Sequence, residues 1–157
     1  MKPTLTTIAA SLSLTALVIA NPVASADTSS LPSVKMQGGV SYVTGGIGEN
    51  EAAALKHAAA TYPLELLFAQ KAQPKDVYIA DVKIVIRDRS GNPVLDTTAE
   101  GPFLLAKLPA GKYQIEAEYD GVRKQQAIEI HPGKHRRAVF VWARGNEGNQ
   151  SVLDSAR

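Results

Sequence analysis

The clearest alternation of apolar and polar residues in this chain runs from Lys112 to Tyr119. Lysine, glutamine and glutamate occupy every second position, which is the period of a strand with one buried and one solvent-facing side. Asp120-Gly121 follows directly and is a strong signal for a two-residue hairpin turn. Val122–Ile130 is therefore predicted to run back antiparallel to this strand. The apolar positions are Tyr113, Ile115, Ala117 and Tyr119.

Other short apolar runs are bounded by turn residues and predict more strands. Val77–Arg87 is apolar on both of its alternating faces, so we expect a central strand that is covered on both sides. About seven strands follow from Leu64 or slightly earlier, and their short loops are typical of an antiparallel β-sandwich. The other expected strands are Val40–Thr44, Leu64–Ala69, Val94–Thr98, Phe103–Leu108 and His135–Trp142, and the turns between strands are Arg89–Pro93, Gly101-Pro102 and His131–Lys134.

The alanine-rich segment from Glu49 to Thr61 predicts the one accessory α-helix of this mainly β fold. Gly48 or Asn50 can cap its N-terminus, acidic residues suit the positive end of the helix dipole, and Pro63 prevents continuation. An apolar face at helical spacing allows the helix to lie on a sheet. The residues on this face are Leu55, Ala58, Ala59 and Tyr62.

The N-terminal segment has the pattern of a secretory signal peptide. Lys2 precedes an apolar run from Ile8 to Ala20, and Ala24-Ser25-Ala26 provides a cleavage site, so residues 1–26 are expected to be removed. The remaining chain has the usual size of one domain. Along it we expect a flexible lead-in at 27–37, a short strand, helix and strand at 38–76 that lead into the sandwich, the sandwich at 77–143, and a disordered tail at 144–157.

The chain contains no cysteine. Disulfides, thiolate metal sites and thiol catalysis are therefore excluded in the oxidising compartment to which export leads. A bacterial lipid anchor on a cysteine at the cleavage site is excluded as well. No later stretch has the ~20 apolar residues that a membrane span needs. We therefore expect a periplasmic protein without a membrane span after signal cleavage, with secretion to the cell exterior as the alternative.

Lysine and arginine total 17 against 15 acidic residues, and loss of Lys2 would leave a net charge of about +1. This balance gives no electrostatic reason to expect a nucleic-acid partner. The densest basic cluster lies on the last two expected strands and the turn between them. Charge on an edge strand prevents aggregation, and the same charge could instead bind an acidic envelope protein or glycan. The cluster consists of Arg123, Lys124, Lys134, His135, Arg136 and Arg137.

Two segments of the sequence resemble ligand-binding motifs, but each lacks residues that the motif requires. Gly45-Gly46-Ile47-Gly48 lies between a strand and a helix, but its spacing is not that of a phosphate loop. The two glutamates that follow would repel a phosphate from the helix N-terminus. His131 and His135 flank one turn and, with His57, are the only imidazoles, yet two ligands do not define a zinc site. We expect no metal or cofactor at either place.

Glu116 and Glu118 are the pair of carboxylates with a spacing that catalysis could use. They lie on one side of a strand about 7 Å apart, which falls within the separation seen in inverting glycosidases. Lys112 and Gln114 continue the same polar face, however, which is the pattern of an ordinary solvent-facing side. No serine stands in a nucleophile-elbow motif. We therefore expect no catalytic residues.

The segment Leu108–Tyr113, with Asp88–Val94 upstream and Ile128–Ile130 downstream, resembles the carboxypeptidase regulatory-like domains. These are transthyretin-like β-sandwiches in which a Leu-Pro-x-Gly-x-Tyr turn leads into a strand and its tyrosine packs into the sandwich. The resemblance covers about Val77–Trp142 and implies a fold rather than an activity. Its motif positions are Leu108, Pro109, Gly111, where we expect a positive φ, and Tyr113.

The expected function is that of a non-catalytic periplasmic interaction or structural module whose envelope partner, protein or glycan, is unknown. The segment Gly45–Glu51 could dock such a module on a neighbouring protein. One alternative is an envelope glycan-binding module. Another is a small hydrolase, because transthyretin-like sandwiches include the hydroxyisourate hydrolases. That resemblance implies a cleft with several histidines and an arginine, and a Tyr-Arg-Gly-Ser C-terminus that Leu153–Arg157 does not match.

Overall fold

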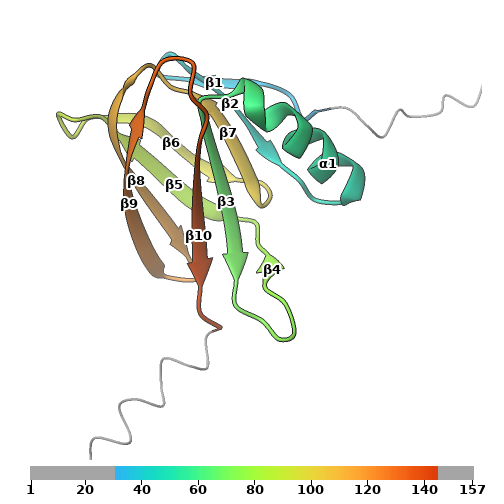
Figure 1. Ribbon diagram of the computed structural model, residues 1–157. Coiled ribbons are helices and arrows are strands. Elements are labelled where there is room, and N and C mark those ends of the chain that lie inside the picture. Colours follow the sequence, from blue (N-terminus) through green and yellow to red (C-terminus); the bar gives the residue numbers. More distant parts are fainter. Residues whose placement is uncertain (1–30, 145–157) are drawn as a thin grey trace, which may run out of the picture.

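The computed structural model describes residues 31–144 as two β-sheets packed face to face, with one helix outside (Figure 1). A 3₁₀ turn, η1 (Ala59–Thr61), extends the helix. The elements are β1 (Lys35–Gln37), β2 (Val40–Gly45), α1 (Glu49–Ala58), β3 (Leu64–Gln70), β4 (Val77–Tyr78), β5 (Val82–Arg87), β6 (Pro93–Ala99), β7 (Phe103–Lys107), β8 (Gly111–Tyr119), β9 (Val122–Ile130) and β10 (Arg136–Trp142).

The strand order is β1-β2-β7-β3-β10 in sheet A, where β4 also pairs with β3, and β6-β5-β8-β9 in sheet B. The mainly β sandwich with one accessory helix is therefore confirmed. One pairing departs from the expected antiparallel pattern, since β10 runs parallel to β3. The turn at His131–Lys134 forms as expected, with Lys134 N–H donating to His131 O over 3.1 Å. It carries the chain from sheet B to sheet A instead of closing a hairpin.

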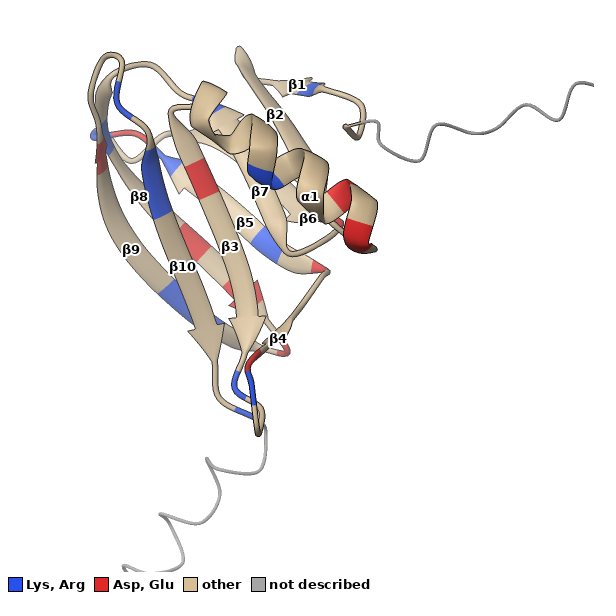
Figure 2. Cartoon of the chain, turned by 45° about the vertical axis from the view of Figure 1, so that its right-hand side comes forward, with Lys and Arg blue, Asp and Glu red and all other residues tan. Residues whose placement is uncertain are grey.

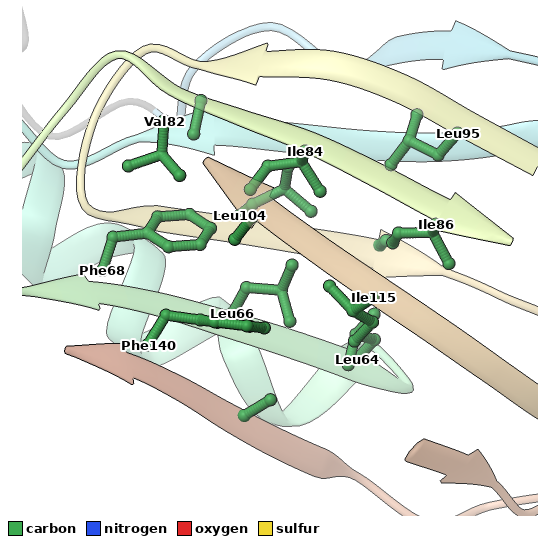
Figure 3. Close-up of a cluster of buried hydrophobic side chains, with 14 of the residues drawn as sticks. Leu64, Leu66, Phe68, Val82, Ile84, Ile86, Leu95, Leu104, Ile115 and Phe140 are labelled. Carbon is green, nitrogen blue, oxygen red and sulfur yellow. The ribbon is translucent and has the colours of Figure 1, made fainter. Parts of the chain in front are cut away.

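The main core lies between the sheets, where the inward side chains of β3 meet those of β5 and β8 (Figure 3). Each fully buried large side chain contributes roughly 1.5–3 kcal/mol relative to exposure. Phe140 and Trp142 share the inner face of β10, and their stacked rings have centroids 6.1 Å apart. Residues of this core shown in Figure 3 include Leu64, Leu66, Phe68, Val82, Ile84, Ile86, Leu95, Leu104 and Ile115.

The helix covers the outer face of sheet A. Leu55, Ala59 and Tyr62 are buried in a second apolar cluster, which confirms the apolar face predicted for the helix. Their partners on the sheet are Val43, Leu67, Phe103 and Leu105. Strands β3 and β7 are consequently buried on both faces, and the molecule has three layers: helix, sheet A and sheet B.

The expected continuous strand Val77–Arg87 is wrong. The chain leaves sheet A after β4 and enters sheet B at β5. Asp81 turns the chain with a φ of 59°, and its N–H donates to Ala99 O over 2.8 Å. Since the outer face of sheet B is open to solvent, β5 exposes Lys83 and buries only alternate residues. Coverage on both faces belongs to β3 and β7 instead.

The N-terminal boundaries also differ from expectation. Lys35–Gln37, expected in the flexible lead-in, form β1 and pair with β2. Residues 38–76 are part of the sandwich rather than a segment leading into it, because β2 and β3 flank β7 in sheet A. The expected signal peptide at 1–26 and all but Arg144 of the expected tail lie outside the described residues. Within residues 31–144, no helix has the length and apolar character needed to cross a membrane.

The hairpin and the tyrosine turn around β8 form locally. Asp120 and Gly121 have φ values of 49° and 73°, so the predicted two-residue hairpin turn has the positive φ values of type I′. Tyr113 Oη donates to Pro109 O over 3.0 Å, in the manner of the tyrosine corner of β-sandwiches. Burial, with the nearby charge of Asp88, raises the pKa of Tyr113. The positive φ expected at Gly111 is wrong, because Gly111 already begins the extended strand β8.

Leu55→Ala should lower the free energy of unfolding by about 2–5 kcal/mol, since truncation leaves a cavity between α1 and sheet A. Leu55 is 0% exposed. Urea denaturation followed by Trp142 fluorescence measures this loss. His57→Ala, on the exposed side of the same helix, should change stability by no more than about 0.5 kcal/mol. Equal effects of the two variants would contradict the helix packing described above.

Candidate interaction surface

The six basic residues expected to form one surface are separated along the facing edges of the two sheets. Strands β9 and β10 do not pair through their backbones, and side chains join them instead. Gln126 Nε2 donates to Val139 O and Trp142 Nε1 donates to Val122 O, each over 2.8 Å. This antiparallel alignment puts Arg123 at the opposite end from Arg136. The two lie about 20 Å apart at a strand rise of ~3.3 Å per residue.

Arg123 is engaged on the outer face of sheet B. Its Nε lies 3.2 Å from Glu116 Oε1, and its Nη2 lies 2.9 Å from Glu118 Oε2. The hydrogen bond from Arg123 lowers the pKa of Glu118, and the positive charges of Arg123 and Lys83 act in the same direction. The carboxylates at glycosidase-like spacing are therefore a solvent-facing ion pair network.

Glu65 organises the other end of the basic cluster. Its side chain is only 8% exposed, and Arg137 Nε lies 3.4 Å from its Oε1. His135 places Nε2 at 3.1 Å from Glu65 Oε2 and Nδ1 at 2.8 Å from Tyr62 O. Both ring nitrogens of His135 thus have partners within the protein. These contacts fasten the start of β10 to β3 and to the end of the helix.

The remaining members of the basic cluster form no continuous patch. Lys124 is half-buried, while Lys134 and Arg136 are exposed. None of these three makes an ion pair with another described residue. Of the six cluster residues, Lys134 and Arg136 are thus the two exposed cations without an ion pair to another residue of the 31–144 range.

Side chains also bridge the sheets at their other edges. The Asp96 N–H of β6 donates to Gln37 Oε1 of β1 over 3.0 Å, and the Glu100 N–H donates to Thr44 Oγ1 over 3.0 Å. Lys35 and Glu100 form an ion pair across the same gap. These contacts, with those of Gln126 and Trp142 on the opposite side, restrict the addition of a partner strand. The sheet edges are thus less suited to binding than the surface beside the helix.

A hollow of about 600 Å³ lies between α1 and β4. Ala52 and Ala53 of the helix face Tyr78 and Ala80 across it, and Pro102 contributes to its lining. Large apolar side chains remain exposed at this place instead of filling it. Ile47 is 67% exposed, Tyr78 is 53% exposed, and Val77, beside Tyr78 on β4, is 47% exposed. We call the hollow with Ile47 and Tyr78 the α1–β4 surface; Val77, the neighbour of Tyr78 in the strand, points to the opposite face of β4.

Charged residues of opposite sign lie at the two ends of the hollow, next to the two ends of α1. Acidic residues mark the first turn of α1 and basic residues the last (Figure 2). Glu49 and Lys56 both line the hollow. Lys56 Nζ lies 5.7 Å from the ring centroids of both Tyr78 and Phe103. It makes no ion pair with a carboxylate in the part of the chain that the structure describes.

The glycine-rich segment before the helix is a turn that leads into α1. The side-chain carboxylate of Glu51 accepts a hydrogen bond inside this turn. Gly46 N–H donates to Glu51 Oε1 over 2.5 Å. Gly46 and Gly48 have φ values of 97° and 91°, a conformation that favours glycine. The Gly46 N–H, which a bound phosphate would need as a donor, is thus already bonded to Glu51. The acidic first turn opposes an anion further.

The three histidines are not assembled into one site. His57 lines a shallow hollow with Leu31, whereas His135 lines another with Tyr62. His131 is exposed in the turn before β10. Among residues 31–144, no group of three or more histidine, aspartate or glutamate side chains is arranged to hold a metal ion.

Sequence comparison assigns no function to this arrangement. No protein-family model matches the chain, and no curated protein is similar enough to count as a relative.

Sequence reasoning singled out the Gly45–Glu51 segment but missed Lys56 and Tyr78 as its neighbours. The small residues of the helix were a local signal for unfilled space beside it. Nothing local connected them to β4, since Tyr78 was expected inside a long buried strand. The break before β5 exposes Tyr78 and brings it to the hollow.

Glu65→Gln should destabilise the fold by about 1–3 kcal/mol, because His135 and Arg137 would lose the carboxylate that both contact. Chemical denaturation at pH 7 measures the change. Glu129→Gln, which removes an exposed carboxylate on β9, is the matched control and should stay within about 0.5 kcal/mol of the unmodified protein. A Glu65→Gln variant as stable as this control would contradict a structural role for the Glu65 cluster.

Arg123→Gln should lower the melting temperature at neutral pH and have a smaller effect in acid. Arg123 holds the pKa of Glu118 below its ordinary value of 4.5. A carboxyl group whose folded-state pKa is lowered contributes stability above its unfolded-state pKa and loses it as the pH falls through the folded-state value. Thermal melts at pH 7 and at a series of values below 4.5 test this. For Lys112→Gln, on the same face of β8, the difference in melting temperature from the unmodified protein should not shrink in acid. If the difference for Arg123→Gln is the same at every pH, the stabilisation does not come from the lowered pKa of Glu118.

Proposed function

We propose that this chain is a non-catalytic interaction module of the bacterial envelope, and that it meets its partner through the α1–β4 surface. The observation that carries the proposal is the exposure of Ile47 and Tyr78 around a largely apolar hollow. Apolar side chains gathered at a concave place are typical of protein contact sites. The docking role considered for Gly45–Glu51 is thereby extended to β4, a segment remote in sequence.

The proposed compartment is the periplasm. The charged start, apolar run and small-residue cleavage pattern of residues 1–26 support export. A cysteine-free chain is also suited to an oxidising compartment, because it has no thiol to mispair. Secretion to the exterior is the alternative destination.

The resemblance to carboxypeptidase regulatory-like domains belongs to the same proposal. The two-layered sandwich and the hydrogen bond between Tyr113 and Pro109 support it. Such domains are a fold without a fixed activity, which agrees with an interaction role. A transthyretin-like hydrolase is a weaker candidate, because His57 and His135 line different hollows and both nitrogens of His135 are engaged.

A basic-surface alternative remains at Lys134 and Arg136, where an acidic protein or anionic glycan could bind. Arg136→Glu is the suitable variant for testing it. Arg137→Glu is unsuitable, because it would place a second carboxylate against Glu65, which Arg137 now contacts. Loss of the partner in Arg136→Glu would move the contact site to this end of the molecule.

Site-specific photocrosslinking in cells tests the proposal. A photoreactive amino acid at position 47 or 78 should give one discrete adduct with the same partner from both positions. The same group at position 112, on the outer face of sheet B, should not give that adduct. Both test side chains are already exposed, so neither replacement should disturb the core. No adduct from positions 47 and 78, or equal adducts from all three positions, would overturn the proposed surface.

A further inference from the structure

The hollow exists because the helix presents alanines to β4 and to the residues that follow it. Glu49, Ala52, Ala53 and Lys56 lie on one side of α1 at spacings of three and four, so they line the same strip of the hollow. The middle of this strip carries only methyl groups. Its walls can therefore accept a side chain from outside without displacing one of their own.

The two ends of this strip carry opposite charge. Glu49 and Lys56 are seven residues apart, which corresponds to about 10 Å along a helix. Lys56 is held over two aromatic rings at 5.7 Å. An ammonium group over ring faces gains from the ring quadrupole and can still accept a carboxylate. An acidic group would be attracted at the Lys56 end and repelled at the Glu49 end.

From this pattern we propose that the hollow receives one large apolar side chain of a partner polypeptide, whose neighbouring aspartate or glutamate pairs with Lys56. This inference rests on the proposed function and names the chemistry of the partner. The open rim favours a polypeptide over a small molecule. Ile47 and Tyr78 stand exposed beside the hollow, and a bound segment would cover them as well as fill the space between them. Interfaces commonly combine such an apolar anchor with a polar surround.

The test uses four N-acetylated, C-amidated hexapeptides added to the mature protein, with residues assigned by NMR. Three have the order serine, phenylalanine, leucine, X, serine, glycine, where X is aspartate, asparagine or lysine. In the fourth, the two apolar residues are replaced by serine and X is aspartate. The expected order of affinity is aspartate, then asparagine, then lysine, with amide shifts confined to α1 and β4. The serine-substituted peptide should not bind. The dissociation constants of successive peptides in this order should differ by about two- to fivefold, as expected for an exposed ion pair.

Three variants show whether binding depends on the hollow and on Lys56. Lys56→Glu should reverse the order so that the lysine peptide binds best. Lys107→Glu is the matched control, because Lys107 also lies over a ring, 5.4 Å from the centroid of Tyr62, but outside the hollow; it should leave the order unchanged. Ala53→Leu should abolish binding by filling the hollow, while the melting temperature shows that the fold is retained.

The outcomes separate this inference from the proposed function. Absence of shifts at the hollow with every peptide, or an order unaffected by Lys56→Glu, overturns the inference even if photocrosslinking identifies a partner. Peptide binding in the expected order without any partner adduct from positions 47 and 78 would instead overturn the proposed function. Equal affinity for the aspartate and lysine peptides would refute the assigned role of Lys56.

Discussion

The whole fold depends on burying β3 and β7 on both faces. Leu66 and Phe68 face sheet B, while Leu67 lies on the other side beneath the helix. A strand that is apolar on both sides cannot form a stable outer layer, because one side would remain in water. The helix is therefore a third layer required by sheet A, and its attachment by Leu55 and Tyr62 follows from the same requirement.

The edges of the sandwich are closed by side chains rather than by backbone pairing. Gln126 and Trp142 join β9 to β10, and Gln37 joins β1 to β6. The backbone carbonyls of Val122 and Val139 and the backbone N–H of Asp96 obtain side-chain partners in this way, without continuous strand pairing around the molecule. Glu65 instead strengthens an existing backbone pairing, that of β3 with β10 in sheet A, through its contacts with His135 and Arg137. Much of the apparent basic surface thus serves the internal structure.

The α1–β4 surface lies where the helix and sheet A no longer pack closely against each other. The chain must cross between the sheets near Asp81, and this crossing leaves β4 as a short strand beside β3. The helix above it presents alanines, so the space between is not filled. Tyr78 and Ile47 remain exposed there. A topological requirement of the sandwich thereby leaves an apolar hollow beside β4.

The sequence by itself determined the elements whose causes are local. The alternation in β8, the Asp120-Gly121 turn and the apolar face of α1 each depend on residues adjacent along the chain or within two helical turns. Only the tertiary structure decided that β10 pairs parallel to β3, that Val77–Arg87 divides between two sheets, and that His135 contacts Glu65, a residue 70 positions away. The physical reason is that hydrophobic alternation specifies which face of a strand is buried, but not the strand or charge against which it is buried.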